Sequence, residues 1–172
     1  MKVKNIRKYL TEEQITERVK AMGEQISKDY GGETVYLICI LKGSIFFTCE
    51  LAKRITSPVE IDFMSVSSYG AGTSSSGVVK IGKDLDTTIE GKNVLVVEDI
   101  IDSGRTLSYL LQNLKTRNPK SLKLCTLLDK PDRRVCDVKV DYVGFVVGFG
   151  LDLDQQYRNL PYIGCVELED EE

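Results

Sequence analysis

The sequence predicts an α/β protein built on a central, mostly parallel twisted sheet that is flanked by helices. Two observations favour this fold: short apolar segments typical of buried strands, and amphipathic segments that alternate with them along the chain. Such alternation usually gives right-handed crossovers and places ligands at the carboxyl ends of the strands. We therefore expect functional residues directly after the strands.

Five segments are expected to form strands. Residues 35–41 are nearly all apolar, as in a strand buried on both faces, whereas residues 59–66 alternate like a strand with one exposed face. Further apolar strands are expected at residues 93–97, 122–128 and 142–147.

Helices are expected between these strands. Thr11 and Gln14 have the spacing of a capping box, and apolar residues then recur at helical spacing as far as Gly31. Two more helices are expected, from about residue 45 to 55 and over residues 104–115, where leucines share one face. With no repeat or linker in its 172 residues, the chain is expected to form a single domain with a solvated acidic tail, residues 167–172.

The composition excludes several kinds of chemistry. The chain has no histidine, which excludes Ser-His-Asp and Cys-His catalysis and histidine-based zinc sites. A bound metal would therefore have oxygen ligands, as magnesium, calcium and manganese prefer. A net charge of −3 gives no overall field for binding nucleic acid, so any anion site must be local.

A cytoplasmic location and no membrane contact are expected. No apolar run approaches the roughly 18 residues that a membrane-spanning helix needs, and the charged N-terminus has no signal-peptide block after it. The five cysteines are odd in number and form no C-x-x-C pair, which favours reduced thiols over disulfides or zinc.

A long stretch of small residues follows the strand expected at residues 59–66. Serine, glycine and threonine dominate residues 67–78. Loops of that length are uncommon in compact domains unless they are disordered or act as lids, and we favour a mobile lid over an inert linker.

The junction after residues 93–97 carries the strongest functional signal. Glu98, Asp99 and Asp102 bring three carboxylates together, which would repel one another without a cation or hydrogen-bond partners. For Asp102 alone, a purely structural role as the N-cap of the next helix remains open. The pattern is not that of a Walker A loop, so ATP hydrolysis is not indicated.

The residues that follow suit an anion. Free backbone N–H groups at a helix start, with the Ser103 and Thr106 hydroxyls and the bare Gly104, would cradle a phosphate. Arg105 could add positive charge, although its side chain could equally point to solvent.

The whole string resembles the phosphoribosyl-diphosphate signature of type I phosphoribosyltransferases, and residues 98–102 are closest to the hypoxanthine-guanine phosphoribosyltransferases. In its short length the chain resembles the compact bacterial form of these enzymes. Residues 41–43, 68–69, 130–131 and 145–152 continue the resemblance in the family's order. It implies the type I fold, with a small hood region and a mobile lid loop.

The resemblance also implies a reaction, the magnesium-dependent transfer of 5-phosphoribosyl from phosphoribosyl diphosphate to a 6-oxopurine. Asp102 would be the general base at purine N7, and in a chain without histidine a carboxylate is the natural candidate. Glu98 and Asp99 would hold the ribose hydroxyls, directly or through magnesium. Residues 102–106 would bind the 5′-phosphate.

The remaining roles also come from the resemblance. Lys130 would donate to purine O6. Phe145 or Val146 would contact the base, with Phe149 a near-equal candidate to Phe145 for stacking, and Asp152 would belong to the purine pocket and ligate magnesium. Lys42, Gly43 and Arg158 would contact the diphosphate. The lid would include Ser68 and Tyr69. Taken alone, these lysines are more typical of surface charges, and Phe145 of a core residue.

Two alternatives remain. One is a phosphoribosyltransferase for xanthine or a pyrimidine, because only Lys130 and the region of Val146 would read the base. The other is a non-catalytic regulator that senses phosphoribosyl diphosphate and binds RNA or DNA, as some proteins of this fold do. The acidic balance and the presence of Asp102 disfavour it, so we expect no nucleic-acid partner. By resemblance, we expect a homodimer or homotetramer.

Overall fold

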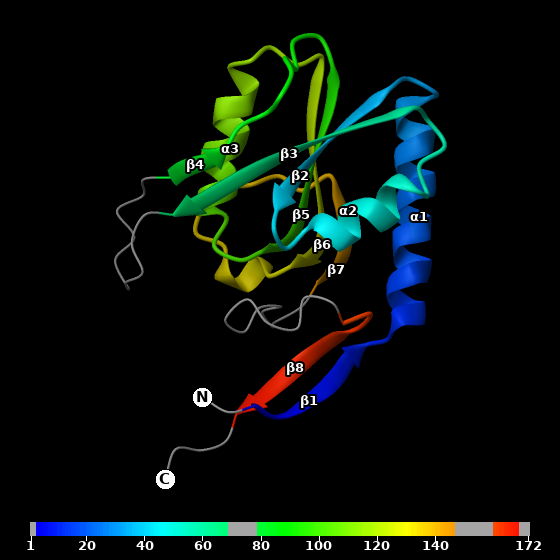
Figure 1. Ribbon diagram of the computed structural model, residues 1–172, viewed down its shortest axis with the longest axis vertical. Coiled ribbons are helices and arrows are strands. Elements are labelled where there is room, and N and C mark those ends of the chain that lie inside the picture. Colours follow the sequence, from blue (N-terminus) through cyan, green and yellow to red (C-terminus); the bar gives the residue numbers. More distant parts are fainter. Residues whose placement is uncertain (1–2, 69–78, 147–159, 169–172) are drawn as a thin grey trace.

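The computed structural model of the chain describes residues 3–68, 79–146 and 160–168 and contains two sheets (Figure 1). A six-stranded sheet has the order β4-β3-β2-β5-β6-β7, and β1 and β8 form a separate ribbon. The strands are β1 (Val3–Leu10), β2 (Val35–Leu41), β3 (Val59–Ser68), β4 (Val79–Lys83), β5 (Asn93–Ile101), β6 (Ser121–Asp129), β7 (Tyr142–Val146) and β8 (Ile163–Leu168). The helices are α1 (Glu12–Tyr30), α2 (Ile45–Ala52), α3 (Arg105–Lys115) and the short 3₁₀ helix η1 (Pro131–Arg133).

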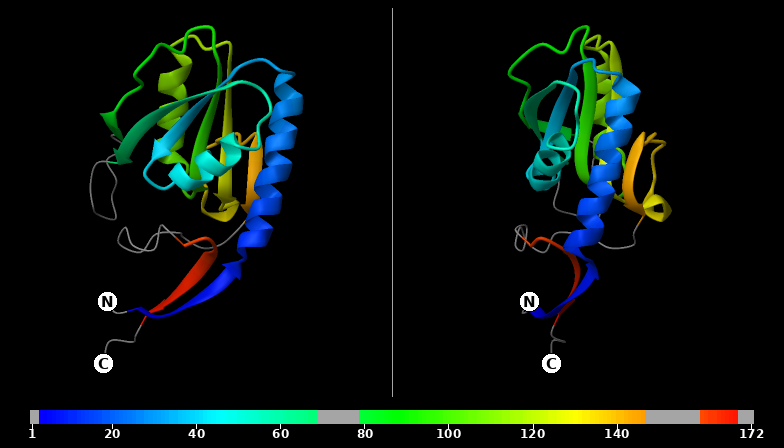
Figure 2. Two further views of the ribbon diagram at one scale, coloured as in Figure 1. Left: turned by 45° about the vertical axis from the view of Figure 1, so that its right-hand side comes forward. Right: turned by 90° about the vertical axis from the view of Figure 1, so that its right-hand side faces the viewer.

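The large sheet confirms the expected architecture. Strands β3, β2, β5, β6 and β7 are parallel, and only β4 runs antiparallel to its neighbour. The carboxyl ends of β2, β5 and β6 point toward the β1–β8 ribbon, which extends from that end of the molecule in every view (Figures 1 and 2). The ribbon is the small hood that the resemblance implied.

The central strands are buried on both faces. Leu95 and Val97 of β5 pack in a core with α1 and α2, whereas the alternate residues Val94 and Val96 pack in a second core with α3. Because successive side chains of a strand point to opposite faces, such a strand needs an unbroken apolar run. This explains why the central strands were predictable.

Helix α1 begins and ends where the sequence predicted. Gln14 N–H donates to the Thr11 hydroxyl (3.3 Å), Thr11 N–H donates to the Gln14 amide oxygen (2.9 Å), and the helix is capped by Gly31 at φ +58°. Arg18 on this helix donates to the carbonyls of Val143 and Gly144 (2.8 Å to the latter) and so fixes β7 at the sheet edge. In the described part of the chain, no helix is long and apolar enough to cross a membrane.

Several boundaries differ from the prediction. The short strands β1, β4 and β8 were not predicted, because each depends on a partner that its own sequence does not reveal. Glu167 and Leu168 pair with Asn5 and Val3 in the β1–β8 ladder, so these two residues of the predicted solvated tail belong to a strand; residues 169–172 lie outside the described part. Strand β3 continues through Ser68, two residues into the predicted lid, and residues 69–78 of that lid lie outside the described part.

A buried carboxylate connects three parts of the large sheet. Asp62 on β3 is only 4% exposed, and it accepts hydrogen bonds from the Tyr36 hydroxyl (2.6 Å), from Phe63 N–H (2.7 Å) and from Asp86 N–H (2.8 Å). The Lys83 ammonium lies 3.7 Å away. Burial alone would raise the pKa of Asp62, but these donors together hold it below the ordinary value of 3.8.

Asp62→Asn is expected to lower the free energy of unfolding by about 2 kcal/mol near neutral pH, because it replaces a satisfied buried acceptor with an amide. A lowered folded-state pKa stabilises the ionised form, so this contribution is complete above about pH 4 and is lost as the pH falls through the folded pKa. Urea unfolding of both proteins across this range measures the difference. Asp86→Asn, at a 75% exposed carboxylate paired with Lys83, is the control, and equal midpoints for all three proteins near neutral pH would contradict the prediction.

Candidate active site

Two of the predicted carboxylates lie near the carboxyl end of the central strand β5. It continues to Ile101, four residues beyond the predicted end at 97, so Glu98 and Asp99 belong to the strand rather than to a turn. The β6 ladder explains the extension, because β6 pairs with β5 as far as Ile101 whereas β2 pairs only to Val97. The carboxylates therefore have a rigid backbone.

The loop after β2 lies directly against these carboxylates. A Cβ atom added at Gly43 would overlap the Asp99 carboxylate, so only glycine fits at this close approach. The preceding peptide bond, Leu41–Lys42, is cis, and Lys42 itself is exposed. The structure thus brings together Gly43 and Asp99, which are 56 positions apart in the sequence.

The acidic pair has no basic counterpart within the described ranges. There, no lysine or arginine lies within ion-pair distance of Glu98 or Asp99, and no group of three acidic or cysteine side chains could hold a metal. Although Glu98 as a residue is partly exposed, protein surrounds its carboxyl group, and this burial, with the neighbouring Asp99 carboxyl, raises the pKa of Glu98 well above its usual range.

The turn after β5 is shaped for an anion. Gly104, at φ +78°, is the N-cap residue of α3, and no side chain caps the helix start. The Ser103 hydroxyl accepts from Arg105 N–H at 3.5 Å, a weak contact. The structural alternative for Asp102 is therefore wrong: Asp102 is not the helix cap.

Lys130 lies beside this turn, at the end of β6. Its side chain is buried, with only 5% of the residue exposed, and its N–H donates to the Ile101 carbonyl at 3.0 Å. Among residues 3–68, 79–146 and 160–168, no carboxylate is within ion-pair distance of its ammonium group. No carboxylate in this part of the chain occupies its ammonium group, so Lys130 is suited to donate to an acceptor on a ligand.

Asp102 has a neighbour that the sequence did not predict. Arg133 Nε lies 3.1 Å from Asp102 Oδ1. Arg133 and Arg134 belong to a charged run, residues 130–134, whose spacing gives no sign of which side chain pairs with which partner.

The other predicted residues are placed only in part. Phe145 is partly buried against the core with α1 and α2, and Val146 ends β7 opposite Asp129. Ser68 ends β3, and Thr106 lies in the first turn of α3. Four further candidates lie outside the described residues: Tyr69, Phe149, Asp152 and Arg158.

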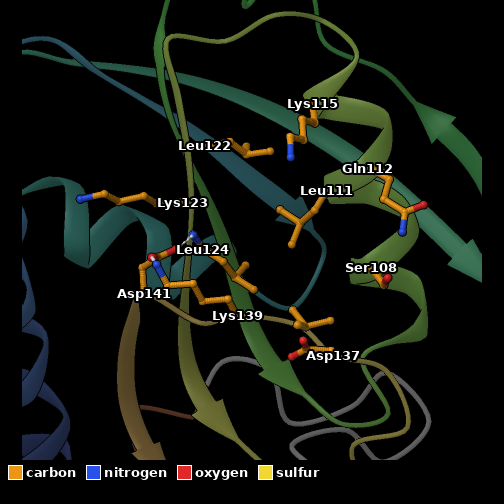
Figure 3. A pocket seen from close by; sticks show the side chains of 11 residues that line it. Ser108, Leu111, Gln112, Lys115, Leu122, Lys123, Leu124, Asp137, Lys139 and Asp141 are labelled. Atoms are coloured by element: carbon orange, nitrogen blue, oxygen red, sulfur yellow. Dashed lines mark hydrogen bonds and ion pairs between the residues drawn. The ribbon is translucent and has the colours of Figure 1, made fainter.

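A separate hollow lies between α3, β6 and residues 137–141 (Figure 3). It has a volume of about 270 Å³, with Leu111 and Leu122 on its walls and the Lys139–Asp141 ion pair (3.1 Å) at its rim. None of the described residues that line it belongs to the predicted active site.

The comparisons with known proteins agree with this arrangement. Residues 6–157 match the family model described as phosphoribosyl transferase domain. The chain belongs to the phosphoribosyltransferase family, as residues 98–106 predicted.

Its relatives point to one branch of the family. The chain is 52% identical to the hypoxanthine-guanine phosphoribosyltransferase of Streptococcus thermophilus, with 96% of each chain covered. It is 52% identical to that of Mycobacterium tuberculosis, over 92% of this chain and 84% of the relative. A crystal structure of the hypoxanthine-guanine phosphoribosyltransferase from Bacillus anthracis superposes with a TM-score of 0.89 at 47% identity, covering 97% and 100% of the two chains. These similarities confirm both the predicted resemblance and the enzyme class, a pentosyltransferase.

Proposed function

We propose that the chain is a cytoplasmic purine salvage enzyme, acting as one domain, that transfers 5-phosphoribosyl from phosphoribosyl diphosphate to hypoxanthine or guanine. The products are IMP or GMP and diphosphate. The observation that carries this proposal is a convergence at the carboxyl ends of three neighbouring strands. Lys42 and Gly43 follow β2, Glu98 to Thr106 span the end of β5 and the start of α3, and Lys130 follows β6. The free thiols of Cys39, Cys49, Cys125 and Cys136 in the described part support the cytoplasmic location.

The acidic pair suits the sugar. Breaking the bond at ribose C1 develops positive charge on the ring, and carboxylates fixed nearby stabilise that charge. In this proposal Glu98 and Asp99 hold the ribose hydroxyls. Gly43, packed against Asp99, keeps the diphosphate loop beside the sugar, with Lys42 and Arg158 proposed to contact the diphosphate.

Magnesium fits this pair. Both side chains offer oxygen ligands, and within the described residues neither has a lysine or arginine partner to neutralise it. We propose Glu98 and Asp99, with Asp152, as the residues that hold the ion. When bound, magnesium would offset the negative charge of the departing diphosphate.

The start of α3 suits the 5′-phosphate. Its first backbone N–H groups have no side-chain cap, and the bare Gly104 leaves room for an anion at the positive end of the helix dipole. We propose that Asp102 to Thr106 bind the phosphate in this way. Arg105 and the two hydroxyls, Ser103 and Thr106, would supply further donors.

The base would lie between Asp102 and Lys130. Asp102 would accept the N7 proton while the N-glycosidic bond forms, and Lys130 would donate to O6, which selects a 6-oxopurine over a 6-aminopurine. Phe145 and Val146 would contact the ring. Ser68 and Tyr69 would belong to a lid that keeps water from the cationic transition state.

Lys130→Gln is expected to raise the KM for hypoxanthine and guanine about tenfold or more, because the amide is shorter and uncharged, while the KM for phosphoribosyl diphosphate stays within about twofold. Steady-state kinetics with a panel of bases measures this, including xanthine, adenine and uracil. Lys139→Gln, at an 86% exposed lysine, is the control. Unchanged base KM values in Lys130→Gln would contradict the assignment of Lys130.

The same panel separates the alternatives. Turnover of xanthine or uracil alone would establish another base as the substrate. Tight, salt-sensitive binding of RNA or DNA without turnover would establish a regulator.

We also propose that the chain forms a homodimer or homotetramer. Phe46 on α2 and Ile61 on β3 are 59% and 44% exposed, which is unusual for large apolar side chains and supports a subunit contact.

A further inference from the structure

The short helix η1 is attached directly to the turn after β5. Lys130 N–H donates to the Ile101 carbonyl and Val135 N–H donates to the Ser103 carbonyl, both at 3.0 Å. These two bonds lie on either side of η1. They hold the residue proposed to read the base and the turn proposed to bind the phosphate in one hydrogen-bonded unit.

Arg134 fixes η1 from the other side. Its guanidinium pairs with Asp129 and donates to the Val138 carbonyl at 3.3 Å, and it is largely buried, with 15% of the side chain exposed. A Cβ atom at Gly104 would lie 2.9 Å from Arg134 Cδ, so the absence of that atom permits the contact. The contacts of Arg134 therefore hold the backbone of Arg133, the preceding residue.

The contact between Arg133 and Asp102 gives the two carboxylate oxygens of Asp102 different surroundings. Oδ1 is covered by protein and has no hydrogen bond with good geometry among the described residues, and its cationic neighbour is Arg133 Nε at 3.1 Å. The Asp102 side chain is nevertheless 46% exposed. The exposed carboxylate oxygen is therefore Oδ2, which is free to face a ligand while Oδ1 is held.

We propose that Arg133 is a positioning residue for Asp102, an inference that rests on the proposed function. The guanidinium lies against Oδ1 and orients Oδ2 toward the purine N7 proton. The pair is partly exposed, with 67% and 46% of the side chains accessible, so solvent screens it and its effect on turnover is modest.

Arg133→Gln is expected to lower kcat with hypoxanthine about fivefold, with the KM for phosphoribosyl diphosphate and the thermal midpoint unchanged. Arg133→Lys is expected to retain kcat within about twofold, because the contact is an ion pair that a lysine ammonium can also make. Arg54→Gln, which removes an arginine paired with Glu50 (3.7 Å) on α2, is the matched control and should behave as the wild type.

The decisive comparison uses Asp102→Asn as a second background. If Arg133 acts through Asp102, Arg133→Gln causes no further fall in kcat there, because the partner is already uncharged. If Arg133→Gln lowered kcat equally in both backgrounds, Arg133 would not act through Asp102. If it left kcat unchanged in the wild-type background while Asp102→Asn lowered kcat, the role of Arg133 would be overturned and the proposed function would stand. If Asp102→Asn itself kept full turnover, the assigned base would fail and this inference with it.

Discussion

Asp102→Asn is expected to lower kcat at least about a hundredfold, the usual contribution of a positioned general base. The amide matches the carboxylate in size but cannot accept the N7 proton. The turn that would bind the 5′-phosphate is capped by Gly104 rather than by Asp102, so its backbone should survive the change. The affinity for phosphoribosyl diphosphate, measured by calorimetry without base, is accordingly expected to stay within about threefold.

Asp132→Asn is the matched control for this experiment. Asp132 is an exposed carboxylate in η1, next to Arg133, and has no role in the proposed reaction. It is expected to keep the wild-type kcat. If Asp102→Asn turned over as fast as Asp132→Asn, the general base would have to be another group.

Gly43→Ala is expected to lower kcat/KM for phosphoribosyl diphosphate about a hundredfold. The added methyl group would overlap the Asp99 carboxylate, so either the loop after β2 or the end of β5 must move. A displacement of about 1 Å between reacting groups can cost that much. Overpacking should also destabilise the fold by about 1–3 kcal/mol, which thermal unfolding of the variant would report.

Gly82→Ala is the control for the effect of replacing a glycine where the added methyl group meets no close contact. Gly82 lies in β4, where a Cβ atom would meet Ser65 Oγ at 3.5 Å, an ordinary contact. We expect this variant to retain its kcat/KM. Wild-type kinetics for Gly43→Ala would show that the close approach to Asp99 has no functional role.

The elements that the sequence predicted well are those whose signals are local. The capping box of α1 and the unbroken apolar runs of β2 and β5 are patterns of adjacent residues, so they can be recognised without knowing the rest of the fold. In β3, by contrast, alternation predicted one exposed face, and yet the polar residue Asp62 is buried while Ile61 is 44% exposed. Donors from Tyr36 and Asp86 make that inversion possible, and they lie 24 or more positions away.

The same distinction applies to the candidate site. The string from Glu98 to Thr106 was found from the sequence because its residues are contiguous, and the family comparison confirms its class. The packing of Gly43 on Asp99 and the pairing of Arg133 with Asp102 join residues that are distant in sequence. Such contacts depend on strand order, which no local pattern specifies.

The structure defines the local geometry of residues 98–106. Glu98 and Asp99 lie on strand β5, and Gly104 rather than Asp102 is the N-cap residue of α3. No side chain caps the start of this helix. The proposed reading of the purine by Lys130 is supported by the burial of this residue without a carboxylate partner in the described part of the chain.

Product analysis with the purified wild-type protein tests the proposed reaction most directly. With hypoxanthine, phosphoribosyl diphosphate and magnesium, we expect IMP and diphosphate to form in equal amounts, and formation to stop when EDTA removes the metal and resume when magnesium is restored. Release of diphosphate without any nucleotide, or no reaction with either hypoxanthine or guanine, would contradict the assignment.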